Sequence, residues 1–360
     1  MVHLVIVRDH PHLSPNKLID RIHEQRPEIE VTGLNYRPNA YDSVRVYVRA
    51  RIDPATGSKY RLDYSDAFVD PYDGRVLGDR MWGAARFDRV HIMPFLYKLH
   101  YSLHIPENVG IILLGIIALM WMFDCFVGFY LTLPMKAAAP KVAKGKQKNW
   151  WERWKPAWQI KYQARFTRIN LDIHRASGLW FWIVIFILAM TSVSLNLGEE
   201  IVRPVVRIFA QMDDAEWLPP TTQPPRSDAP PRITYATAVS HALGALPEES
   251  RDLTVAYLSY VKDRNVYWVA LKPPGRENAF LRLEHTQVFV DGDTGDIRRM
   301  RSYEAGKAGD KFMDWQFPLH TGQILGLPGR VLICLAGVLV LVLSITGVIV
   351  WWRKLQARRA

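Results

Sequence analysis

Three stretches of the chain are apolar over roughly the 20 residues that a helix needs to cross the hydrocarbon core of a membrane. They run over Val109–Leu133, Gly178–Leu197 and Val331–Trp352. The second and third contain no charged residue, and the first contains only Asp124. The pattern predicts three membrane-spanning helices, in preference to buried helices of a soluble protein.

The more polar segments between these stretches contain an internal repeat. Phe68–Val76 and Phe289–Ile297 both read as β-hairpins with Asp and Gly residues at the turn, and they lie 221 positions apart. The repeat predicts an α+β domain in each segment. Three more segments of the first half have counterparts at nearly the same offset. Helix-like residues 14–22 match 233–239, and strand-like residues 44–49 match 265–271. The entrances of two spans, at 95–100 and 317–320, also match.

The repeat also predicts a helix that the numbered chain does not contain. Its second half reads as span, α+β domain and span, whereas its first half reads only as domain and span. The counterpart of Gly178–Leu197 would fall before Met1. We therefore expect a first helix upstream of Met1 and four spans in the complete protein.

Charge is distributed in a way that predicts the orientation of the spans. The chain carries 46 Lys and Arg against 35 Asp and Glu, a formal charge of +11. Residues 134–177 hold 11 of the basic residues and only 2 acidic ones, and the tail after Trp352 adds four more basic residues. Basic segments beside apolar spans indicate the cytoplasmic side of a membrane. They are topology signals, so we expect no nucleic-acid partner, and both α+β segments should be exported.

Four histidines stand at or near the entrances of spans: His100, His104, His174 and His320. A neutral imidazole is a natural axial ligand of haem iron. His100 and His320 occupy equivalent positions of the repeat on the exported side, so they could hold one haem between them. His174 lies on the cytoplasmic side and would need a partner on the upstream helix.

Other interpretations of these histidines stay open. Each could simply contact water or lipid headgroups at the membrane surface. His104 follows His100 by one helical turn and should share its face, so it could replace His100 as the haem ligand, or the two could bind a divalent metal. Tryptophans 150, 151, 154 and 158 favour an interfacial anchoring helix over a path for electrons.

Several classes of chemistry lose support from the sequence. Phosphate-binding loops, HExxH zinc motifs, nucleophile elbows and a convincing dinucleotide fingerprint are all absent. The two cysteines, Cys125 and Cys334, allow no disulfide scaffold, and no CxxCH motif indicates covalently attached haem. A redox role through a bound cofactor remains, because it requires little more than ligands at the correct depth.

The FVDPYDG and FVDGDTG turns, the DIHRASGLW entrance and the LHTGQILGLPGR segment resemble the bacterial PepSY-associated transmembrane helix family. Within that family the chain is most similar to inner-membrane ferric-siderophore reductases of the ferrioxamine reductase type. This resemblance implies b-type haem, one or two copies, and electron transfer across the bacterial inner membrane to Fe(III) in a periplasmic siderophore. Fe(II) would then be released for iron uptake.

The resemblance assigns roles to individual residues. His100 and His320 match the family's periplasmic span-entry histidines, and His174 matches the cytoplasmic one, all three as axial ligands of haem iron. The electron donor would be a quinol or a cytoplasmic reductase. The competing hypothesis is a non-enzymatic membrane protein whose PepSY-like domains bind or regulate exported peptidases or other partners.

The expected fold is a bundle of transmembrane helices with two repeated PepSY-like α+β periplasmic domains, embedded in inner-membrane lipid. The predicted organisation is PepSY-like domain 1 at 1–98, a span with its His entrance at 99–133, a basic cytoplasmic loop with a Trp-rich interfacial helix at 134–177, a span at 178–197, PepSY-like domain 2 at 198–318, a span with its His entrance at 319–352 and a basic cytoplasmic tail at 353–360.

Overall fold

The computed structural model describes residues 3–36, 41–134, 148–213, 230–274 and 282–359. The chain divides into two compact units. Unit 1 comprises Met1–His104 and Val206–Asp314, and unit 2 comprises Ile105–Val205 and Trp315–Ala360. Both units are therefore assembled from two separate stretches of sequence.

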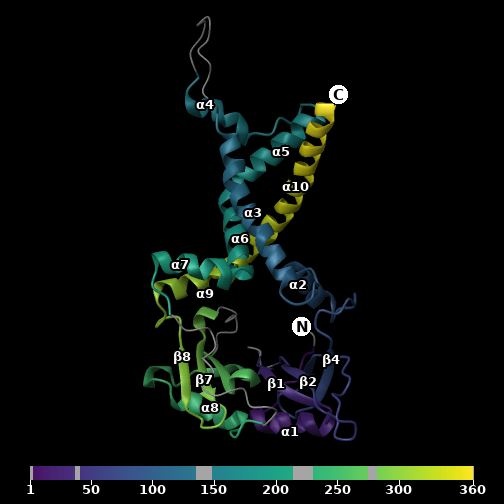
Figure 1. Ribbon diagram of the computed structural model, residues 1–360, viewed down its shortest axis with the longest axis vertical. Coiled ribbons are helices and arrows are strands. Elements are labelled where there is room, and N and C mark those ends of the chain that lie inside the picture. The colour runs from purple at the N-terminus through teal and green to yellow at the C-terminus, as the bar shows by residue number, and fades with distance from the viewer. Residues whose placement is uncertain (1–2, 37–40, 135–147, 214–229, 275–281, 360) are drawn as a thin grey trace, which may run out of the picture. The chain divides into compact units, whose positions relative to one another are not determined.

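Unit 1 has the element order helix, four strands, helix in each of its two stretches (Figure 1). The first stretch contains α1 (Pro15–Gln25), β1 (Ile29–Asn35), β2 (Val44–Ala50), β3 (Asp66–Val69), β4 (Val76–Arg80) and α2 (Ile92–Ser102). The second contains α8 (Tyr235–Gly244), β5 (Thr254–Val261), β6 (Val266–Lys272), β7 (Thr286–Asp291) and β8 (Ile297–Arg301), followed by α9 (Ala308–His320), which continues into unit 2.

The strands of both stretches form one antiparallel sheet of eight strands in the described part of the chain, in the order β4-β3-β2-β1-β5-β6-β7-β8. Its two halves meet where β1 pairs with β5. The paired residues at this seam are Gly33 with Ser259, Leu34 with Leu258 and Asn35 with Tyr257. The two segments expected as separate domains thus share one sheet.

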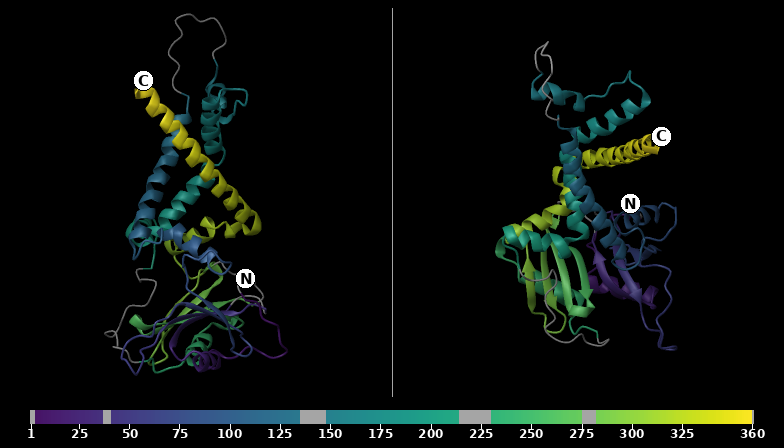
Figure 2. Two further views of the ribbon diagram at one scale, coloured as in Figure 1. Left: turned by 90° about the vertical axis from the view of Figure 1, so that its right-hand side faces the viewer. Right: turned by 45° about the horizontal axis from the view of Figure 1, so that its top comes forward.

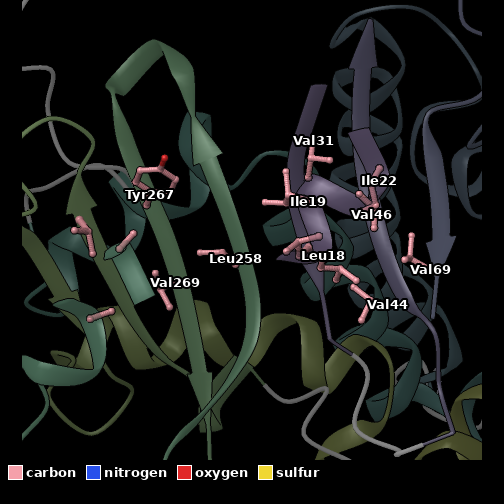
Figure 3. Packing of buried hydrophobic residues seen from close by; sticks show 14 of the residues in the cluster. Leu18, Ile19, Ile22, Val31, Val44, Val46, Val69, Leu258, Tyr267 and Val269 are labelled. Atoms are coloured by element: carbon pink, nitrogen blue, oxygen red, sulfur yellow. The ribbon is translucent and has the colours of Figure 1, made fainter. Parts of the chain in front are cut away.

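They also share one hydrophobic core (Figure 3). Leu18 and Ile22 of α1 are fully buried together with Leu258 and Tyr267 of the second half. Helices α1 and α8 each begin at an N-cap residue with a hydroxyl side chain. Ser14 accepts a hydrogen bond from the Lys17 amide, and Thr234 accepts one from the Thr237 amide. Burial of these apolar side chains couples the stability of the two halves.

The two predicted hairpins are confirmed, and their turns have the same geometry. Gly74 in the β3–β4 turn and Gly295 in the β7–β8 turn have φ angles of +78° and +80°, a region that favours glycine. The pairing register shifts after Phe68 in one hairpin and after Phe289 in the other. Local turn chemistry therefore sets both hairpins.

Unit 2 consists of helices, which Figure 2 shows in two further views. It contains α3 (Val109–Thr132), α4 (Trp150–Trp154), η1 (Lys155–Trp158), α5 (Phe166–Trp180), α6 (Trp182–Asn196), η2 (Gly198–Val202), the start of α7 (Arg203–Phe209), η6 (Gln323–Leu325) and α10 (Gly326–Arg359). Helices α3 and α10 are long and apolar enough to cross a membrane, as predicted. Lys136, Lys141, Lys144 and Lys146 of the predicted basic loop lie outside the described residues.

The span predicted over Gly178–Leu197 falls within a bent pair of helices. The helix begins at Phe166 and is bent by 73° between α5 and α6, so this pair is one broken span or a re-entrant segment. The break lies at Phe181, whose φ of −109° and ψ of 13° are not helical. As a result α6 packs against α3, whereas α5 packs against α10.

The packing of the hairpin turn on α1 can be tested with two glycines of similar backbone conformation. A Cβ atom at Gly74 would lie 2.6 Å from the Cβ of Arg21, whereas at Gly57, with φ +66°, no described atom lies within 4 Å. Both Gly→Ala changes place an alanine at an unfavourable positive φ, but only Gly74→Ala adds a steric clash. We expect Gly74→Ala to lower the free energy of unfolding by about 1 to 3 kcal/mol more than Gly57→Ala. Unfolding of the detergent-purified full chain would measure the difference, and equal losses would contradict the described packing.

Candidate functional site

His174 contacts a threonine of another helix. It lies on α5, and its Nδ1 atom is 2.9 Å from the hydroxyl oxygen of Thr346 on α10. Gly347 leaves room for the imidazole, because a Cβ there would lie 3.2 Å from Cε1 of His174. The ring is therefore held on one edge by Thr346 and has glycine beside it.

His320 makes a similar contact with a threonine of another helix. It is the last residue of α9, and its Nδ1 atom lies 3.0 Å from the hydroxyl oxygen of Thr191 on α6. Thr191 is completely buried within the apolar helix. Both predicted ligand histidines of unit 2 are thus oriented through the same ring nitrogen by a buried threonine.

The two histidine–threonine contacts lie near opposite ends of unit 2. His320 precedes α10 by a few residues, whereas Thr346 lies far along it. At 1.5 Å per residue, Thr346 is about 30 Å along the axis from Gly326, close to the thickness of a hydrocarbon core. Figure 1 shows α5, which carries His174, beside the C-terminal part of α10.

His100 and His104 belong to unit 1, on or beside α2. His100 is exposed in the last turn of that helix. The expectation that His104 continues the same helical face is wrong, because Leu103 and His104 have φ angles of +53° and +58° and α2 ends at Ser102. Nε2 of His104 lies 3.0 Å from the carbonyl oxygen of Phe95, and its ring stacks on that phenyl group.

The structure therefore places His174 and His320 against threonines. The pairing of His100 with His320 stays a prediction, since these two histidines belong to different units.

Sequence reasoning missed Thr191, Thr346 and Gly347. A signal was present, because isolated polar residues within apolar spans often mark a functional contact. Both threonines lie with a serine in largely apolar runs, in LAMTSV and LSITGV.

A second polar cluster, also unpredicted, surrounds Asp172 one half-turn before His174. The Asp172 carboxylate is fully buried and accepts hydrogen bonds from Arg168 and Arg175, at 3.0 and 2.9 Å. It also lies 3.4 Å from the Lys161 amide. Arg175 in addition donates to the Pro156 carbonyl at 2.8 Å. The cluster ties the segment after α4 to the helix that carries His174.

The tryptophans of this segment pack as anchors against the helices. Trp154 is buried beside Ala157 and Leu179, and its indole donates to the Thr132 hydroxyl at 3.2 Å. Trp180 donates to the Trp158 carbonyl at 3.2 Å. The predicted Trp-rich helix is present as the short α4 and η1. Its contacts with α5 are at Leu179 and Trp180, the C-terminal end of that helix.

The donor chemistry of unit 2 fits an axial haem ligand better than a multidentate metal site. Among the described residues, no group of three or more His, Cys, Asp or Glu side chains comes together as a metal site. A haem ligand requires only one imidazole nitrogen, with the other nitrogen held by an outer acceptor. His174 and His320 both meet that requirement at Nδ1.

The comparison with protein families identifies a family for this chain. A family model described as the PepSY-associated TM region matches residues 6–354 of the chain. The comparison with curated proteins returns no match. The family match covers both units.

The Asp172 cluster predicts a change in local stability. Asp172→Asn removes the charge that pairs with Arg168 and Arg175 while keeping the volume, so we expect the free energy of unfolding to fall by about 1 to 3 kcal/mol. Trypsin cleavage after Lys161 should also become faster. The control is Glu200→Gln, which changes an exposed carboxylate of unit 2. If Asp172→Asn behaves like the control in both measurements, the cluster does not hold this segment.

Proposed function

Since the chain belongs to the PepSY-associated TM family, we propose that it is a haem-containing ferric-siderophore reductase of the bacterial inner membrane. It would pass electrons across the membrane to Fe(III) in a periplasmic siderophore and release Fe(II). The observation that carries the proposal is the placement of His174 and His320 near opposite ends of the unit 2 helices, each oriented at Nδ1 by a buried threonine.

Each of the two histidines would hold one haem b through Nε2. Bound haem supplies a one-electron Fe(III)/Fe(II) couple within a layer that excludes charged carriers. The partner proposed for His320 is His100, with His104 as the alternative.

The protein's own residues supply the orientation, because Thr191 and Thr346 contact the two rings at Nδ1. Apolar residues of α3, α6 and α10, among them Ile185, Ala189, Leu339 and Leu343, pack together in the helical unit. Electrons would enter on the side of the basic segments, from a quinol or a cytoplasmic reductase. In that orientation unit 1 lies in the periplasm.

Unit 1 would then bind the iron chelate. We propose that its two halves are repeated PepSY-like modules, which is supported by their matching element order and by the shared turn geometry at Gly74 and Gly295. The edges of the joint sheet are β4 and β8. The chelate is a substrate, and its Fe(III) would be the electron acceptor.

The proposal predicts a b-type absorption spectrum. Full-length protein made with ample haem and purified in detergent should show a Soret band. Its reduced form, freed of dithionite, should reoxidise when ferrioxamine is added. A featureless spectrum would overturn the reductase and favour the binding-module hypothesis.

Substitution of the ligands tests the assignment. His320→Ala and His174→Ala should each remove one haem, because each deletes an iron ligand, while the fold persists. His10→Ala, which changes an exposed histidine of unit 1, is the control and should leave haem content unchanged. The pyridine haemochrome assay measures the stoichiometry. Unchanged haem content in both variants would show that other residues are the ligands.

A further inference from the structure

The hydroxyl proton of Thr346 already has an acceptor. Its Oγ1 donates to the Val342 carbonyl, one turn earlier in α10, at 2.7 Å. A hydroxyl has a single proton, so its oxygen can only accept from a further partner. Oγ1 also lies 3.2 Å from the Leu343 carbonyl, so both alternative acceptors of the hydroxyl proton belong to its own helix. The 2.9 Å contact with His174 is therefore assigned as an Nδ1–H donation from the imidazole to Thr346.

Thr191 repeats this arrangement at the other end of unit 2. Its Oγ1 donates to the Ile187 carbonyl at 2.7 Å. It also lies 3.0 Å from the Leu188 carbonyl of the same helix. The 3.0 Å contact with His320 is then assigned as an Nδ1–H donation to Thr191. In both pairs the hydroxyl proton points to a carbonyl of its own helix, and the hydroxyl oxygen accepts a hydrogen bond from a histidine of another helix.

This hydrogen-bond direction selects one tautomer of each histidine. A neutral imidazole carries one N–H, so protonation at Nδ1 leaves the lone pair on Nε2. His104 shows the opposite arrangement, since its Nε2 must donate to the Phe95 carbonyl. The tautomer with its lone pair on Nε2 is therefore imposed at His174 and His320 and not at every histidine near a span.

We infer that Thr346 and Thr191 are positioning residues that fix His174 and His320 in the Nδ1–H tautomer and thereby set the affinity and reduction potential of the iron that these histidines bind. The inference rests on the proposed function. An acceptor at Nδ1–H makes the imidazole a stronger donor through Nε2. A stronger donor stabilises Fe(III) over Fe(II), so each threonine should lower the potential of its haem.

Burial gives this contact its strength. Thr191 is completely buried and Thr346 nearly so. The two histidines are themselves half-buried, so removal of the hydroxyl takes away a buried hydrogen-bond acceptor of Nδ1–H. Without its acceptor the ring is free to turn or to change tautomer, either of which moves the lone pair away from the iron position.

The test uses full-length, haem-reconstituted protein with Thr346→Val and Thr191→Val, which keep the side-chain shape but remove the acceptor. We expect haem to bind about 10- to 100-fold more weakly to the altered site, by analogy with outer-shell partners of metal-ligating histidines. The midpoint potential of the haem that remains should become more positive. Thr346→Ser and Thr191→Ser, which keep the hydroxyl, should restore both quantities.

Thr132→Val is the matched control. The Thr132 hydroxyl also donates to a carbonyl of its own helix, that of Phe129, and accepts an indole N–H from Trp154. It thus has the same hydrogen-bond pattern without a histidine. This variant should change thermal stability but neither haem affinity nor potential.

The outcomes separate the inference from the function on which it rests. If wild-type protein binds haem, and both valine variants keep its affinity and potential, the threonines do not position the ligands although the reductase stands. If wild-type protein binds no haem, the proposed function itself fails. If a valine variant does not fold, Thr→Cys replaces it, because sulfur is a weak acceptor. Cysteine variants with unchanged affinity and potential would overturn the inference.

Discussion

The bend at Phe181 is the constraint on which the arrangement of unit 2 depends. A straight helix from Phe166 to Asn196 could follow only one neighbour along its length, but the 73° bend allows α5 to lie on α10 while α6 lies on α3. The first contact brings His174 to Thr346, and α6 carries Thr191 to the site of His320. A single non-helical residue therefore supports both histidine contacts.

Local signals in the sequence predicted much of the fold. The apolar runs gave α3 and α10, and the Asp and Gly clusters gave both hairpins, because turn geometry depends on a few adjacent residues. The bend at Phe181 had no such signal, since neither proline nor glycine occupies the break. The end of α2 before His104 was missed for the same reason, because Leu103 is not a residue that favours positive φ.

Long-range contacts account for most of the rest. The repeat indicated two similar α+β segments, but no local pattern indicates whether two such segments form two sheets or one. The candidate histidines were visible in the sequence because they stand at span entrances, whereas their threonine partners lie on other helices and more than a hundred positions away. Nor did spacing reveal Asp172, whose burial results from packing against the segment around Pro156 and Lys161.

The seam between β1 and β5 has a consequence for how the chain is made. These strands pair although about 220 residues separate them in the sequence, so at synthesis rates of 5 to 20 residues per second β1 waits roughly 10 to 45 s for its neighbour. During that interval its edge and the apolar side chains of the first half are unprotected, which is the condition under which nascent chains pair with the wrong strand or aggregate. The helices α3, α5 and α6 emerge in the same interval. Completion of the sheet is therefore a late step, which follows the synthesis of α3, α5 and α6.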